Sequence, residues 1–150
     1  MYCNEVWGNT YQTYLDPLCK IQKRAIRVVA FEKRFSHTDP IFKSLGLLKL
    51  KEIHAYSLQL FMFKYHHDKL PNVFKDFFTR NDTIYCRTTR QNRKFHVFLS
   101  RNNITSNIVR KTGVTLYNYF YDVIDLCCSY NVYKKNLKYH ILNNDVLSVF

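Results

Sequence analysis

Four cations repeat along one predicted helix at a spacing that suits contact with phosphates. They are Lys20, Lys23, Arg24 and Arg27. Because they recur every three or four residues, a helix gathers them on one face. Such a row can follow a phosphate backbone and release its counterions. The sequence therefore predicts a nucleic-acid-binding face here, and a solvated helix face is the alternative.

A second group of cations lies in a segment without sustained periodicity. It consists of Arg87, Arg90, Arg93 and Lys94. Tyr85 and Phe95 flank the group, and their rings could stack on unpaired bases. The alternative is that both rings belong to the core and the cations face water. Together with the first group, these residues form the predicted nucleic-acid site.

No residue pattern in the chain predicts catalysis or a metal site. Nucleotidyl transfer needs carboxylates that hold metal ions close together, yet no two aspartates are adjacent. Asp122 and Asp125 are expected on the solvent face of a helix. Cys127 and Cys128 lack the CxxC spacing of structural zinc sites, and no P-loop or Gly-x-Ser-x-Gly motif occurs. We therefore expect no enzymatic activity from the chain by itself, no metal and no cofactor.

The basic helix is predicted to begin at Asp16-Pro17, because aspartate can cap a helix and proline suits its first turn. A different side of this helix is apolar. Its residues are Leu18, Ile21, Ala25, Val28 and Val29. Gln22 is an unexpected polar residue on that side, and it should bond the backbone of a neighbouring loop.

Two further helices are predicted before residue 70. Thr38-Asp39-Pro40 should begin a short one, which Gly46 can end in a left-handed turn. Residues 50–66 are apolar nearly all round a helix, with Glu52 and Gln59 as the polar strip. A helix of this kind is expected to be central and mostly buried.

The second half of the chain combines a basic loop region with two more helices. Residues 79–111 are expected to be partly irregular, with a short strand at Phe95–Leu99. Helical patterns return from Gly113 and again from about Asn131. The prediction is a mainly α fold, a compact helical domain of about five helices that residues 1–150 form as a single domain.

Composition points to a folded protein with an anionic partner. Hydrophobic residues make up 47% of the 150 residues, which is enough for a core. With 23 Lys and Arg against 11 Asp and Glu, the net charge is +12, and nucleic acid is the first expected partner, with a membrane surface as the main competitor. Five irregularly spaced cysteines favour a reducing compartment, cytoplasm or nucleus. No apolar run predicts a signal peptide or a membrane span.

An ordered series of short motifs runs through the chain. In order they are Glu5-Val6-Trp7-Gly8-Asn9-Thr10-Tyr11, Leu18, Gln22-Lys23-Arg24-Ala25-Ile26-Arg27, His37-Thr38-Asp39-Pro40-Ile41-Phe42, Leu45, Leu48, Leu70-Pro71, Thr89-Arg90, Gly113, Leu116-Tyr117-Asn118 and Tyr133-Lys134-Lys135-Asn136-Leu137. The series resembles the segment that follows the polymerase domain in non-LTR (LINE-type, jockey-like) retrotransposon reverse transcriptases. The chain departs from the family pattern at two positions. The family commonly has Trp in place of Tyr117 and often has Phe in place of Tyr133.

The resemblance implies a fragment of an RNA-directed DNA polymerase without the polymerase and endonuclease domains. Such a segment would extend the thumb, bind template RNA or target DNA, and pack on the polymerase domain of the parent protein. The alternatives are a protein-packing scaffold segment and a mobile-element relic without function. A large exposed apolar patch would favour the scaffold.

Overall fold

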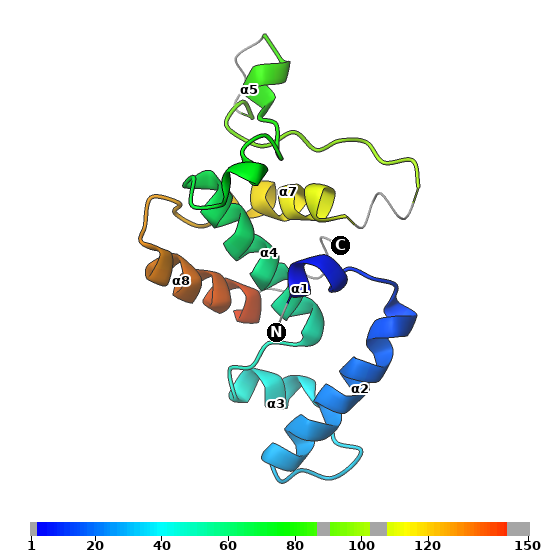
Figure 1. Cartoon of the computed structure of the whole chain (residues 1–150). Coiled ribbons are helices and arrows are strands. Elements are labelled where there is room, and N and C mark those ends of the chain that lie inside the picture. The colour runs from blue at the N-terminus through cyan, green and yellow to red at the C-terminus, as the bar shows by residue number, and fades with distance from the viewer. Residues whose placement is uncertain (1–2, 87–90, 103–107, 144–150) are drawn as a thin grey trace.

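The computed structural model describes residues 3–86, 91–102 and 108–143 (Figure 1). Over these ranges the fold is mainly helical, as predicted, and contains no strand. Its elements are α1 (Asn4–Trp7), α2 (Gln12–Val29), α3 (Asp39–Ser44), α4 (Leu50–His66), the 3₁₀ turn η1 (Asn72–Phe74), α5 (Asn81–Ile84), α7 (Val109–Phe120) and α8 (Tyr130–Asn143). Seven α-helices therefore occur among the described residues where about five were expected, and α1 and α5 are single turns of four residues.

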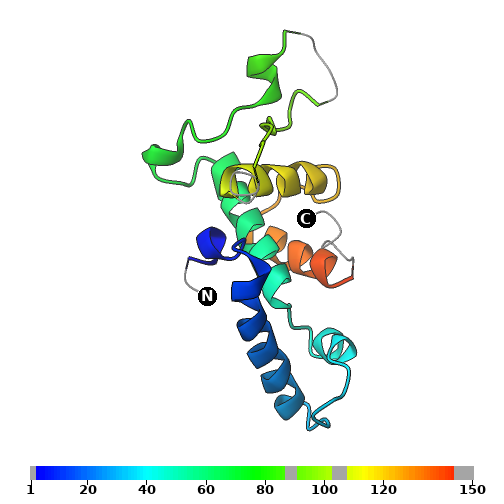
Figure 2. The same ribbon diagram turned by 90° about the vertical axis from the view of Figure 1, so that its right-hand side faces the viewer.

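Helix α4 lies at the centre, with α1, α7 and α8 around it (Figures 1 and 2). The main core cluster joins α4 to α7 and α8 through fully buried side chains such as Leu58, Leu116 and Leu137. Phe63 stacks on Tyr133 of α8, with ring centroids 4.2 Å apart. The predicted bounds and central position of α4 are confirmed, because only a helix covered on several sides can bury apolar residues round its circumference.

Gln59 corrects the predicted polar strip of α4. This side chain is fully buried, and its Oε1 accepts a hydrogen bond from the Tyr133 hydroxyl at 3.4 Å. The exposed side chains of α4 are instead those of Lys51 and Lys64. Glu52 caps the helix, since its Oε2 accepts a 2.8 Å bond from the Lys49 N–H.

The predicted strand at Phe95–Leu99 is wrong. Phe95 forms only an isolated antiparallel bridge with Arg80. Asn118 of α7 holds both backbone polar groups of Phe95, because its Oδ1 accepts from the N–H at 3.1 Å and its Nδ2 donates to the carbonyl at 2.8 Å. The ring of Phe95 is buried against Tyr117 and Phe78. A side chain thus takes the bonds that a neighbouring strand would need.

Helix α2 begins four residues before the predicted start at Asp16-Pro17. Pro17 lies inside the helix, and Asp16 accepts a bond from the Gln12 amide rather than capping the helix end. The extension places Leu15 in a buried position beside His54. Burial of a leucine side chain contributes about 1.5–3 kcal/mol, which offsets the N–H that proline lacks.

Helix α1 packs on α4 through a close backbone approach at Gly8. A Cβ at this position would overlap Nδ1 of His54 and lie 2.6 Å from the carbonyl oxygen of Asn4. His54 Nδ1 donates to that carbonyl at 2.9 Å, and both side chains are buried. Only glycine fits between the two, because any larger residue would separate α1 from α4.

We predict that Gly8→Ala lowers the free energy of unfolding by about 1–3 kcal/mol, the usual cost of overpacking. Urea denaturation followed by circular dichroism measures it. Gly113→Ala is the control, since its Cβ would lie 3.4 Å from the Met62 sulfur, an ordinary contact distance, inside helix α7. That variant should be neutral or gain up to about 1 kcal/mol from helix propensity. Equal losses in both variants would contradict the close approach at Gly8.

We predict that stability falls as pH drops below about 6.5. Burial lowers the pKa of His54 below its usual value, although the bond to Asn4 and the charge of Glu5 oppose the shift. The unfolded chain therefore binds a proton that the folded chain does not, so the free energy of unfolding decreases with falling pH, by up to about 1.4 kcal/mol per pH unit for one such group. Burial lowers the pKa of His66 as well, with the same sign.

Urea denaturation from pH 8 to pH 5 checks this dependence. His54→Gln should flatten the slope, because glutamine does not titrate and can still donate to the Asn4 carbonyl. An unchanged slope in this variant would assign the pH dependence to other groups.

Candidate nucleic-acid interface

The first predicted group of cations forms an exposed row along α2. Lys20, Lys23 and Arg24 are exposed. In the described ranges the ion pairs are Lys49 with Asp39 and Lys94 with Asp122, so none of these three cations makes a direct ion pair there. Lys23 is close enough to Asp39 to help lower the pKa of that carboxyl, whose direct partner is Lys49. The row is therefore exposed to an anionic ligand.

The fourth cation of this group, Arg27, has a structural partner. Its Nε donates to the Ser36 carbonyl at 2.9 Å and ties α2 to the α2–α3 loop. The side-chain hydroxyl of Ser36 also bonds Glu32 at 3.0 Å. Arg27 is half-buried as a result, and it shapes the loop as well as contributing charge.

A hollow of about 630 Å³ continues the row at the C-terminal end of α2. Its lining residues are Arg24, Arg27, Val28, Glu32, Arg34 and Phe35. The Phe35 ring is 89% exposed, and the guanidinium carbon of Arg34 lies 5.8 Å from its centroid. Three arginines beside an open aromatic ring offer the two contacts that an unpaired nucleotide can use, namely phosphate charge and base stacking. No sequence pattern singled out Arg34 and Phe35, because a short loop has no period that would reveal a site.

Phe31 stands beside this hollow in a strained backbone conformation. Its φ is 54°, in the left-handed region that glycine usually occupies. The Glu32 N–H bonds the Arg27 carbonyl at 2.9 Å, which makes a Schellman end to α2. The same position after α3 is occupied by Gly46, as predicted, with φ 60°. Phe31 is 98% exposed, so no burial offsets the strain of about 1–2 kcal/mol.

The second predicted group is divided. Arg87 and Arg90 lie outside the described residues. Arg93 is exposed, whereas Lys94 bonds Asp122 at 2.6 Å and lies over the Tyr121 ring. The ring of Phe95 is buried and not available for stacking, which is the core alternative stated for that residue.

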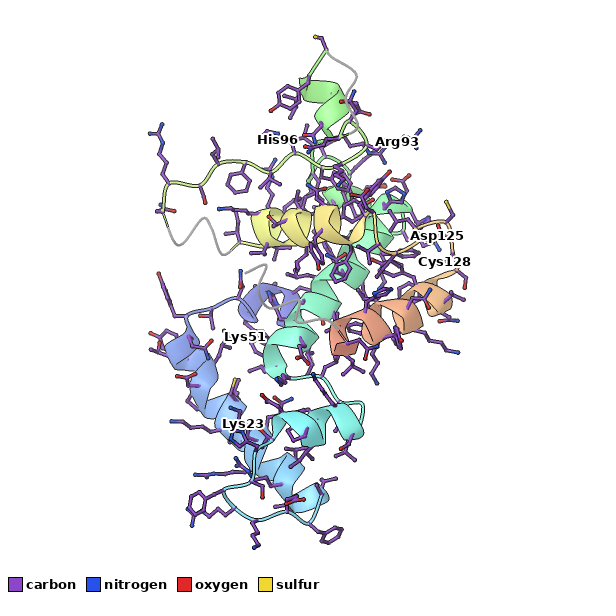
Figure 3. All side chains as sticks on the ribbon, turned by 180° about the vertical axis from the view of Figure 1, so that it is seen from behind. Lys23, Lys51, Arg93, His96, Asp125 and Cys128 are labelled. Carbon is purple, nitrogen blue, oxygen red and sulfur yellow. The ribbon has the colours of Figure 1, made fainter. Side chains whose placement is uncertain are left out.

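The described cations of the second group lie apart from the first group. Figure 3 shows Lys23 on α2 near one end of the molecule and Arg93 near the other, with α4 and α7 between them. Tyr85, which precedes the second group in the sequence, is about half exposed. A single ligand would have to run along most of the molecule to contact both Lys23 and Arg93, so the α2 row and its hollow are treated as a site of their own.

The predicted apolar side of α2 does not pack into the core. Exposed fractions are 44% for Leu18, 60% for Ile21, 75% for Val28 and 63% for Val29. Leu15 and Ile26 are the buried apolar residues of α2, because contact with α3 and α4 is made by only one edge of that side. We call Tyr14, Leu18, Ile21, Ala25, Val28 and Val29 the α2 apolar strip. It runs beside the basic row.

Gln22 attaches α2 to the rest of the fold, as its prediction stated. Its Nε2 donates to the Leu48 carbonyl at 3.0 Å, and its Oε1 accepts from the Leu50 N–H at 3.1 Å. The amide therefore satisfies the loop before α4 and the first turn of α4 together. The orientation of the basic row depends on these two bonds.

Other residues with chemical potential have structural neighbours. Asp122 and Asp125 are exposed, but they follow α7 instead of lying on a helix. His67 bonds the Leu126 carbonyl at 2.9 Å, and His66 bonds the Tyr117 hydroxyl at 2.8 Å. The described part of the chain holds no group of three metal-ligating side chains and no helix that is long and apolar enough to span a bilayer.

We predict that Gln22→Ala weakens both folding and nucleic-acid binding, although Gln22 itself makes no ligand contact. Loss of the amide leaves the Leu48 carbonyl and the Leu50 N–H without their partner, at a cost of about 1–3 kcal/mol. Urea denaturation and RNA titration measure the two effects. Gln12→Ala is the control, because its amide bonds only the exposed Asp16, and it should change stability by less than about 0.5 kcal/mol.

Comparison with known proteins leaves the chain without an assigned family. No family model, no curated protein and no solved structure matches it. The resemblance to the post-polymerase segment of non-LTR reverse transcriptases therefore stays a prediction from the sequence.

Proposed function

We propose that α2 and the α2–α3 loop bind single-stranded nucleic acid. The observation that carries the proposal is the unpaired basic row of α2, which leads directly into a hollow lined by three arginines and the exposed Phe35. A row of free cations alone would suit any anion. The open ring in the same hollow favours a ligand with both phosphates and unpaired bases.

Each part of the site has a distinct role in this proposal. Lys20, Lys23 and Arg24 contact successive phosphates along the helix. Arg34 contacts a further phosphate in the hollow, while an unpaired base stacks on Phe35. These contacts are independent of base identity, because every base has a π-face and every nucleotide has a phosphate.

The proposal agrees with the resemblance to reverse transcriptases. A segment that follows the polymerase domain would hold template RNA or primed target DNA near the active site of its parent protein. Catalysis would come from the polymerase domain, and this chain would contribute binding. Arg93, at the far end of the molecule, would supply a separate contact.

Salt-dependent binding tests the proposal. A fluorescent single-stranded RNA is titrated from about 50 to 200 mM salt against the chain and against Lys20→Ala/Lys23→Ala/Arg24→Ala. The variant should show a shallower slope of log affinity against log salt, by about 2 for three phosphate contacts on a single strand. Phe35→Ala should weaken single-strand binding by about 1–3 kcal/mol and leave duplex binding nearly unchanged.

The matched control is Lys69→Ala/Lys75→Ala/Lys135→Ala, which removes the same charge from exposed residues away from α2. Equal salt slopes in the two triple variants would show that binding depends on net charge alone, and would contradict the site. Equal losses on single strands and duplexes in Phe35→Ala would contradict base stacking.

A second candidate function is packing on another protein. The α2 apolar strip supports it, because a soluble monomer rarely leaves so many large apolar side chains exposed along one helix. In this candidate the segment serves as a scaffold, and the basic row meets an acidic protein surface. The two candidates share Val28, which lines the hollow and also belongs to the α2 apolar strip. The cations and the rest of the strip lie on different sides of α2, so one candidate does not exclude the other.

A further inference from the structure

An apolar groove of about 560 Å³ lies on the side of the molecule away from the basic row. Its lining comes from α2, the end of α3, the α3–α4 connection, α4 and α8. The residues are Gln22, Ala25, Ile26, Val29, Phe42, Gly46, Leu47, Leu48, Ile53, Tyr56, Lys134 and Lys138. Ala25 and Val29 also belong to the α2 apolar strip, so the groove and the strip form one elongated apolar surface.

Several polar groups of this groove already have hydrogen-bond partners. Gln22 uses both ends of its amide on the backbone of Leu48 and Leu50. The Leu47 N–H donates to the Phe42 carbonyl at 2.9 Å. A partner would find few free backbone N–H and C=O groups in the groove with which to form β-type hydrogen bonds. Its own backbone groups must therefore be hydrogen-bonded within the partner. An elongated partner that does so is an α-helix, whose apolar face can lie in the groove.

The charges at the rim of the groove indicate which charges the partner helix should carry. Lys134 and Lys138 lie four residues apart on α8, and both are exposed and line the groove. Among the described residues, no acidic side chain lines the groove. The nearby carboxylates are engaged, since Asp39 pairs with Lys49 at 3.1 Å and Glu52 caps α4. The partner should therefore carry acidic residues along the edge of its apolar face.

We propose that this groove binds an amphipathic α-helix of another protein, with glutamate or aspartate flanking the apolar face of that helix. The proposal rests on the second candidate function and names the occupant of that packing surface. Nucleic acid fits less well, because the floor is largely aliphatic and the described rim carries two lysines as its cations. A flat bilayer fits a concave surface less well than a cylindrical helix does.

A designed peptide tests the proposal. The probe is a fluorescein-labelled 18-residue helix with leucines on one face and glutamates along its edges. Two matched peptides carry lysines in place of the glutamates, or a central proline that prevents the helix. By anisotropy in about 150 mM salt, the glutamate peptide should bind the chain, and each matched peptide should bind about tenfold more weakly or not at all.

Charge reversal at the rim locates the binding. Lys134→Glu/Lys138→Glu should weaken the glutamate peptide by about threefold to tenfold and strengthen the lysine peptide. Lys69→Glu/Lys75→Glu makes the same charge change at two exposed residues that do not line the groove, and it should alter neither peptide. Val29→Asp/Leu47→Asp, at two exposed groove residues, should abolish binding while circular dichroism remains that of the parent chain.

Four results would overturn the proposal. The first three are equal binding of the lysine peptide, binding that survives in Val29→Asp/Leu47→Asp, and binding of anionic phosphatidylserine vesicles without binding of the peptide. The fourth is self-association through the groove, which sedimentation would show as a dimer that is lost in Val29→Asp/Leu47→Asp. The peptide is measured without RNA, and Lys20→Ala/Lys23→Ala/Arg24→Ala should retain it, so failure here is distinct from failure of the nucleic-acid site.

Discussion

The apolar circumference of α4 is the constraint on which the rest of the structure depends. A helix with leucine, methionine and phenylalanine on nearly every side must be covered from several directions, and α1, α7 and α8 supply that cover. The helices around α4 pack closely against it. Gly8 has no Cβ and so lets α1 approach the surface of α4. The buried Gln59 amide accepts a hydrogen bond from the Tyr133 hydroxyl of α8. Helix α2 is attached near the N-terminal end of α4, where Gln22 bonds the Leu50 N–H.

Helix α2 is consequently attached by one edge and exposed on the others. Gln22 and Ile26 make that attachment, and the remaining circumference is divided between cations and apolar residues. A helix buried more deeply would have to neutralise its charges or lose its apolar strip. The limited contact of α2 is thus what permits one element to present two chemically different surfaces, one suited to phosphates and one suited to another protein.

Features with local causes could be predicted from the sequence. The bounds of α4 follow from its apolar period, the end of α3 follows from Gly46, and the exposed row on α2 follows from helical spacing. Features set by distant neighbours could not. Asp16-Pro17 failed as a start because Leu15 gains burial next to His54, and the strand at Phe95 failed because Asn118, 23 residues away, takes its backbone bonds. Arg34 lies in the hollow because of the course of the α2–α3 loop, which has no periodic pattern from which it could be predicted.

Because α2 contacts the rest of the fold along a single edge, its backbone amides should be less protected from hydrogen exchange than those of the core helices. Backbone amides of α4, α7 and α8 can exchange with solvent only when the shared core opens. Those of α2 are released when the two Gln22 bonds and the small cluster of Ile26, Ile41 and Phe42 give way, which leaves the main core intact. We therefore expect α2 to open at a lower free energy than α4, α7 and α8, and a ligand bound along α2 would slow the exchange of its amides first.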